Sequence, residues 1–161
     1  METSLLFGQA LSVWLIALWL ALGALENIRN PAVNRDMVRG VMGMDRMRET
    51  YPEIFAVFGR NRTENRRAQD AAFRAIVVVE CVVTLILLAG AAALTLALFG
   101  LAAPGSARAV AAFGAAAFSG IWGGFLVGGQ WYHYWCGYEG SQVTHFLAAL
   151  WGLATFIALH L

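Results

Sequence analysis

The sequence predicts an all-α integral membrane protein: a bundle of four transmembrane helices with a helical, partly amphipathic connection between the first and the second. Apolar runs with at most one charge occupy residues 5–25, 75–101, 109–131 and 143–159, each close to the roughly 20 residues that cross a bilayer. Hydrophobic residues make up 60% of the 161-residue chain and charged residues 13%, against roughly 25% charged in soluble domains. We expect a single membrane domain over residues 1–161.

The four spans are expected at about residues 5–25, 72–101, 108–132 and 143–160. The first run is longer than the roughly 7–15 apolar residues of a signal peptide, and no basic segment precedes it, so it should stay in the mature protein. Pro104 and Gly105 mark a tight turn between the second and third spans, and an equally short link follows the third. Short links make the last three helices antiparallel neighbours.

The connection at about residues 30–70 carries an amphipathic helical pattern. Its apolar side chains recur at spacings of four and three residues: Val33, Met37, Val41, Met44 and Met47. Arginines occupy the other faces, so this helix either lies on the bilayer surface or packs onto the ends of the membrane helices. Pro52 should begin a second short helix that ends at Gly59. Asn61 or Thr63 should cap the helix that continues into the second span.

The third span carries a ridge of small residues four positions apart. They are Ala112, Ala116, Gly120, Gly124 and Gly128. Small residues at this spacing let helix backbones approach closely in lipid. The ridge is interpreted either as packing within the chain or as a surface for a helix of another subunit.

Polar residues gather at the end of the bundle where the first and third spans end and the second and fourth begin. We expect them to form a buried network: Asn27, Glu80, Thr84, Gln130 and Gln142. An ionised carboxylate in hydrocarbon costs several kcal/mol, so Glu80 should face the bundle and be hydrogen-bonded or protonated. We expect Gln130 to share its network, through Asn27 or water. Glu80 then serves either as a clamp between helices or in a proton relay, ion site or cofactor site.

Two histidines at the facing ends of the last two spans are candidates for metal or haem ligation. His133 and His145 could act with Cys136 as a third ligand. The competing interpretation is an aromatic belt at the membrane interface, because His133 lies among tryptophans and tyrosines. No catalytic triad, phosphate-binding loop or pair of carboxylates is recognisable. The net charge of +1 gives no reason to expect nucleic acid.

Three stretches resemble a bacterial family of small predicted integral membrane proteins, domain of unknown function 2165. The segment from Glu26-Asn27-Ile28 to Met44-Asp45 resembles the family's Asn-Asn…Met-Asp block, and Glu80 matches an acidic residue in the middle of the second span. Gly128-Gly129-Gln130-Trp131-Tyr132 resembles a Gly-Gly-Glu-Trp-Phe motif, which a Gly-x-Gln follows, here Gly140-Ser141-Gln142. The resemblance implies a four-helix membrane fold and no established activity.

The chain departs from this family in its polar residues and in its charge distribution. Gln130 replaces the family's glutamate, and His133 and Cys136 match no family position. Nine arginines between the first two expected spans, in residues 26–71, place the first connection in the cytoplasm by the positive-inside rule. The family resemblance implies the reverse orientation. Labelling Cys136 with a membrane-impermeant maleimide would distinguish the two.

The functional expectation is a non-catalytic accessory subunit or assembly factor of a larger inner-membrane complex, respiratory or photosynthetic. Its partners would be the lipid bilayer and other membrane subunits, with no cofactor. One alternative is a carrier of protons, ions or small molecules that uses Glu80. Another is a membrane protein that binds haem or metal through His133 and His145. All eleven basic residues are arginine, a usage typical of a GC-rich bacterial genome, so we expect the bacterial inner membrane.

Overall fold

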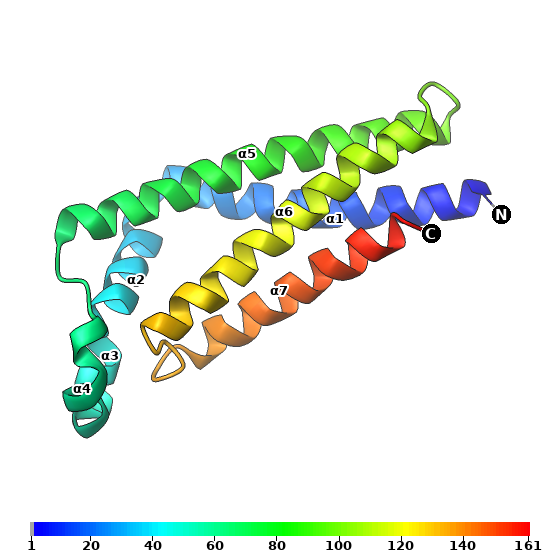
Figure 1. Cartoon of the computed structure of the whole chain (residues 1–161). Coiled ribbons are helices and arrows are strands. Elements are labelled where there is room, and N and C mark those ends of the chain that lie inside the picture. The colour runs from blue at the N-terminus through cyan, green and yellow to red at the C-terminus, as the bar shows by residue number, and fades with distance from the viewer. Residues whose placement is uncertain (1) are drawn as a thin grey trace.

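The computed structural model describes residues 2–161 and contains four long helices, which confirms the four predicted spans. They are α1 (Glu2–Arg29), α5 (Arg66–Leu98), α6 (Pro104–Trp131) and α7 (Glu139–Ala158). Each is long and apolar enough to cross a membrane. The helices run side by side in one elongated bundle, and both termini lie at the same end (Figure 1).

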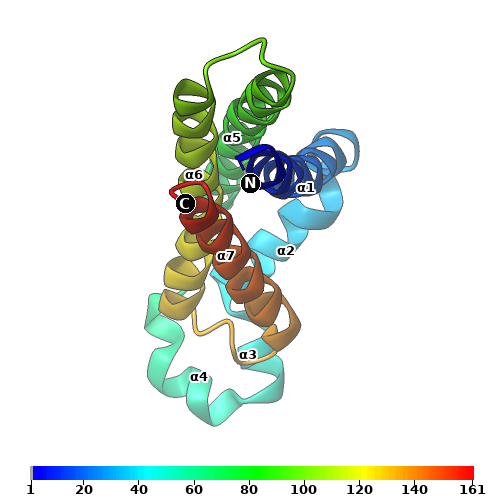
Figure 2. The ribbon, with the colours of Figure 1, turned by 90° about the vertical axis from the view of Figure 1, so that its right-hand side faces the viewer.

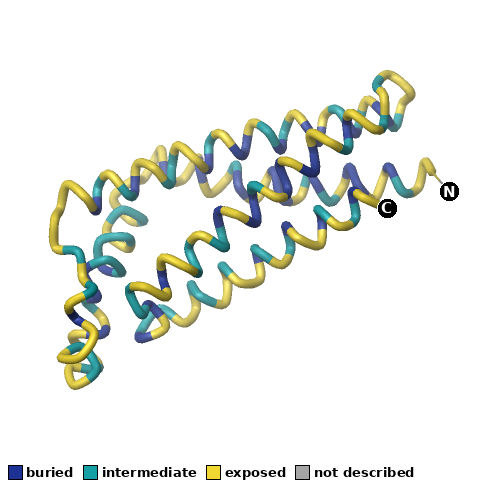
Figure 3. Tube along the Cα trace, in the orientation of Figure 1, coloured by how far each residue is buried: buried dark blue, intermediate teal, exposed yellow. Residues whose placement is uncertain are grey.

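The surface of the bundle is apolar along most of its length, as a lipid-facing surface must be. Large hydrophobic side chains on all four long helices point outward; examples are Leu22, Leu85, Val127 and Leu147, which are 60–75% exposed. In Figure 3 the exposed segments follow the outer faces of the helices, whereas the buried ones face the interior. A soluble bundle would place polar residues on these faces.

The core lies where α1, α5 and α6 cross, and glycine makes the closest approach possible. Leu87, Ala91 and Leu94 of α5 are fully buried. A Cβ added to Gly90 would lie 2.7 Å from the Cα of Ala111 in α6. In α7, Gly152 packs in the same way against Ser119 of α6. These contacts bring backbones together, which is the main source of helix association in lipid.

Polar side chains join three helices near the termini. The Arg108 guanidinium donates to Gln9 Oε1 over 2.9 Å, and Gln9 Nε2 donates to the Ala158 carbonyl over 2.8 Å. Gln9 is therefore buried but satisfied. The sequence pattern did not draw attention to Gln9.

The connection between α1 and α5 folds over the end of the bundle opposite the termini (Figures 1 and 2). It consists of α2 (Pro31–Gly43), α3 (Asp45–Thr50), α4 (Pro52–Phe58) and a 3₁₀ turn, η1 (Gly59–Asn61). The short helix expected from Pro52 to Gly59 is confirmed. The next helix is capped by Asn65, whose side chain accepts from the backbone N–H groups of Arg67 and Ala68. The caps expected at Asn61 or Thr63 were wrong.

The expected single helix over residues 33–47 is broken at Met44. This residue adopts a left-handed conformation with φ of 55°, which ends α2 and starts α3. Met44 and Met47 are buried together with Cys136 of the α6–α7 loop. That half of the amphipathic face therefore packs onto the end of the bundle. The placement of Val33, Met37 and Val41 at a membrane surface stays a prediction.

We predict that Gly90→Ala destabilises the bundle by about 1–3 kcal/mol, because the added methyl group meets backbone atoms that cannot move independently. The measurement is the free energy of unfolding in mixed micelles. Gly8→Ala on α1 is the control, since nothing lies within 4 Å of its added Cβ. An equal effect of both substitutions would show that α5 and α6 are not in close contact.

Candidate functional site

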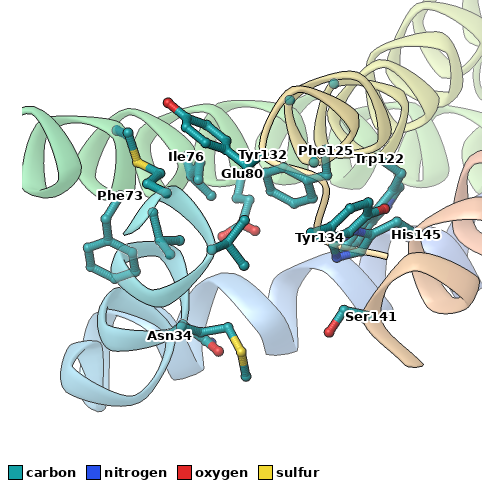
Figure 4. A pocket seen from close by; sticks show the side chains of 18 of the residues that line it. Asn34, Phe73, Ile76, Glu80, Trp122, Phe125, Tyr132, Tyr134, Ser141 and His145 are labelled. Atoms are coloured by element: carbon teal, nitrogen blue, oxygen red, sulfur yellow. The ribbon is translucent and has the colours of Figure 1, made fainter. Parts of the chain in front are cut away.

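A cavity of about 550 Å³ lies at the end of the bundle that α2 covers. Five helices and the α6–α7 loop line it, and Figure 4 shows the side chains around it. The position of Glu80 along α5 shows how deep in the bundle the cavity lies. Glu80 follows Arg74, the last arginine of α5, by six residues, or about 9 Å along the helix axis. The cavity therefore lies just inside the apolar part of the bundle.

A chain of carboxylate and amide groups forms one side of the cavity. Asn27 Nδ2 donates to Glu80 Oε2 over 2.7 Å, and Asn34 Nδ2 donates to Asn27 Oδ1 over 2.6 Å. The three residues come from α1, α5 and α2, so two hydrogen bonds connect three helices. Glu80 and Asn27 are 5% and 7% exposed. The sequence predicted the proximity of Asn27 to Glu80, but not Asn34.

Aromatic rings from α6, α7 and their loop form the opposite side. The His145 ring centroid lies 5.4 Å from that of Trp122, 5.0 Å from that of Phe125 and 6.0 Å from that of Tyr134. Three polar atoms of this aromatic wall are buried and have no hydrogen-bond partner within residues 2–161: Trp122 Nε1, Tyr134 Oη and His145 Nδ1. Buried polar groups are normally paired, so these three atoms are unsatisfied within the aromatic wall.

The small-residue ridge of α6 opens onto this space and contributes little to packing between helices. Ala112 is buried, but Ala116, Gly120, Gly124 and Gly128 are exposed. Gly124 and Gly128 line the cavity, and a Cβ added to either would meet no atom within 4 Å. The interpretation of the whole ridge as packing within the chain is therefore wrong. Because Gly124 and Gly128 have no side chains, space remains there for the cavity.

The aromatic wall depends on a glycine near the end of α6 and on the turns of the α6–α7 loop. The backbone turns back at His133 (φ 51°) and Gly137 (φ 103°). Tyr134 N donates to the Gly129 carbonyl over 2.9 Å. The Tyr134 ring lies directly on Gly129, where an added Cβ would overlap the ring. Gly129 is therefore required for Tyr134 to reach the cavity.

Polar contacts hold α2 and α3 against this loop and against α5. Arg46 donates to the Gly137 carbonyl over 2.7 Å and lies 4.7 Å from the centroid of the Tyr138 ring. Arg39 donates to Asp70 of α5 over 2.6 Å. Charge-assisted hydrogen bonds of this kind are stronger than neutral ones. Together they keep α2 over the cavity.

Several predicted site residues lie outside this arrangement. Gln130 is exposed, and no hydrogen bond joins it to Glu80 within the described residues, so that part of the network was wrong. Gln142 is half-buried and forms no side-chain bond to the network in residues 2–161. Thr84 is buried, but its hydroxyl has no partner there. Gln130 lies in the last turn of α6, and its side chain is exposed.

His133, Cys136 and His145 do not come together. His133 packs on Phe58 with ring centroids 4.3 Å apart, whereas His145 lies in the aromatic wall and Cys136 beside the methionines of α2 and α3. Within residues 2–161 no group of three histidine, cysteine or acidic side chains could hold a metal ion. The three side chains therefore do not form one metal site, and haem ligation by His133 and His145 stays a prediction.

Asn34, Trp122 and Tyr134 are site residues that the sequence did not reveal. Asn34 is a polar residue within the expected apolar face of α2, three residues before Met37 and seven before Val41. Trp122 resembles an ordinary lipid-facing tryptophan within an uncharged run. Tyr134 belongs to a cluster that is typical of an interfacial belt. Spacing from Asn27 could not indicate Asn34, because the two residues lie on different helices with a break at Asn30 between them.

We predict that Asn27→Ala and Glu80→Ala are coupled by about 0.6–1.7 kcal/mol in a double-mutant cycle on unfolding free energy, the range for hydrogen bonds in membranes. The same cycle between Gln130→Ala and Glu80→Ala should give a coupling close to zero. Equal couplings would show that Gln130 does belong to the network.

We also predict that Cys136 reacts slowly with maleimide in the folded protein. The thiol is 3% exposed, and burial together with the Glu139 carboxylate raises its pKa. Less reactive thiolate is therefore present near neutral pH than for an ordinary cysteine, and the rate should rise as the pH approaches the raised pKa.

The control is Glu139→Cys with Cys81→Ala and Cys136→Ser, since position 139 is exposed. It should label rapidly, and in intact cells it reports the side of the membrane better than Cys136 does. Comparable rates at the two positions would contradict the packing of α3 on the loop.

Comparison with known proteins assigns the chain to a family. The model of a family described as predicted small integral membrane protein (DUF2165) matches residues 5–161. No curated protein and no solved structure matches the chain. The four apolar helices agree with the family description, and the protein is a multi-pass integral membrane protein. Because the match covers nearly the whole chain, the chain belongs to the family of predicted small integral membrane proteins, DUF2165.

Proposed function

We propose that the protein is a non-catalytic protein of the bacterial inner membrane that binds a small, largely apolar molecule in the cavity around Glu80. One observation carries the proposal: the cavity of about 550 Å³ combines apolar walls with a few converging polar groups. Ligand sites in proteins typically have about 300–1,000 Å³ and this same composition. Among the sequence-based alternatives, this is closest to a small-molecule carrier that uses Glu80.

The polar groups of the cavity support binding over catalysis. The Glu80 carboxylate accepts a hydrogen bond from Asn27, and the aromatic wall contains three polar atoms without a partner, in Trp122, Tyr134 and His145. Within residues 2–161 no serine, threonine or cysteine side chain is hydrogen-bonded to a histidine, which is the usual mark of an activated nucleophile.

The experiment uses two glycines on one face of α6. Gly124→Leu places a side chain into the cavity, and Gly120→Leu places the same side chain one turn away, outside the cavity lining. Neither added Cβ meets another atom within 4 Å, so both variants should fold.

We predict that native mass spectrometry of the gently extracted protein finds a small molecule bound, and that Gly124→Leu lowers the occupied fraction about tenfold. Gly120→Leu should leave it unchanged. Equal occupancy in both variants would show that the bound molecule lies elsewhere.

A second candidate is the accessory subunit of a respiratory or photosynthetic complex. The exposure of Ala116 and Gly120 favours it, because this part of the ridge is not used for packing within the chain. The same two variants distinguish the candidates. An accessory subunit that docks through the ridge should lose recovery of its partner complex with Gly120→Leu, while Gly124→Leu should leave recovery intact.

A further inference from the structure

We propose that the ligand of this cavity is an amphipathic organic cation, a protonated amine or quaternary ammonium with an apolar body, whose positive charge lies against the Glu80 carboxylate. The inference rests on the proposed function, that the cavity binds a small apolar molecule, and it adds the charge and chemical class of that molecule.

The first argument is that the Glu80 carboxylate has no basic partner among residues 2–161. Its hydrogen-bond partner in the described chain is the neutral amide of Asn27. No arginine lines the cavity, and Glu80 is the one acidic residue among the lining residues that the structure describes. The nearby Arg39 is committed to Asp36 and Asp70. A carboxylate within a membrane helix is stabilised when a cation lies beside it.

The second argument is the aromatic character of the walls. Phe73, Trp122, Phe125, Tyr132 and Tyr134 all line the space into which Glu80 points (Figure 4). The faces of aromatic rings carry negative electrostatic potential and attract cations, most strongly where water is excluded. Aromatic side chains around a carboxylate are the surroundings in which proteins recognise quaternary ammonium groups.

The third argument separates an organic cation from a metal ion. Ca²⁺ and Mg²⁺ require several oxygen ligands, and transition metals require histidine, cysteine or carboxylate groups at close range. Glu80 is one carboxylate in a largely apolar cavity, and the described residues contain no group of three metal-binding side chains. The apolar walls suit a hydrocarbon body, which an inorganic ion lacks.

The experiment compares three aryl-phosphorus or aryl-boron probes that are similar in shape and differ in charge. Tetraphenylphosphonium is a cation, triphenylphosphine oxide is neutral and tetraphenylborate is an anion. Binding is measured by calorimetry on the full chain in phosphatidylcholine nanodiscs, with protein-free nanodiscs as the blank. We expect saturable binding of tetraphenylphosphonium, weaker binding of the neutral probe, and no binding of the anion above the blank.

Two variants then locate the site. Glu80→Gln, which preserves shape and hydrogen bonding, should weaken tetraphenylphosphonium binding at least about 30-fold, as expected when one partner of a buried charge pair is removed. It should change the affinity for the neutral probe less than about threefold. Gly124→Leu should weaken both probes, and Gly120→Leu neither. The comparison of probes on the unchanged chain does not depend on the folding of any variant.

The outcomes separate this inference from the proposed function. If the neutral probe binds as well as the cation, and Gly124→Leu blocks both while Glu80→Gln blocks neither, the cavity is a ligand site but its ligand is not a cation. If Gly124→Leu and Gly120→Leu have the same effect on every probe, both the cation and the ligand site are overturned.

Discussion

The hydrogen bond between Asn27 and Glu80 is the constraint on which the functional end of the structure depends. In hydrocarbon a carboxylate cannot turn outward, so this bond fixes the rotation of α5 about its axis relative to α1. Asn34 then extends the contact to α2, so that the segment after α1 returns over the end of the bundle. The remaining wall, from α6 and α7, does not touch this pair through any hydrogen bond in the described residues. A cavity remains between them, bounded on one side by amides and on the other by rings.

Glycine serves two opposite purposes in this bundle. Gly90 and Gly152 are small because another helix occupies the place of a side chain. At Gly124 and Gly128 no neighbouring atom occupies the place of a side chain, and this empty space is part of the cavity. The two kinds cannot be distinguished by spacing along the helix. Only the position of the neighbouring helices decides whether a row of small residues is a contact or an opening.

This difference explains how much of the molecule the sequence could predict. The four spans and the short helix after Pro52 followed from local patterns of apolarity and turn residues, so the sequence sufficed. Glu80 could be singled out because a charge within an apolar run is unusual at any rotation. The partners of Glu80 depend on helix rotation and crossing, which a shared end of the bundle does not determine. Gln130 therefore appeared equivalent to Asn27, although one is exposed and the other buried. Met44 takes a left-handed backbone that methionine rarely adopts, and no local signal indicates it.

The way in which α2 is attached bears on how the cavity is reached. The long helices pack closely against one another. In contrast, the polar contacts that hold α2 are those of Asn34 and Arg39, together with the contact of α3 with the α6–α7 loop. Elements held by a few polar contacts at a water-accessible boundary open locally at a lower free energy than the whole fold requires. Sub-global opening of α2 therefore widens the cavity at this end of the bundle while the four long helices stay assembled. A larger molecule then enters or leaves the cavity without separation of the transmembrane helices.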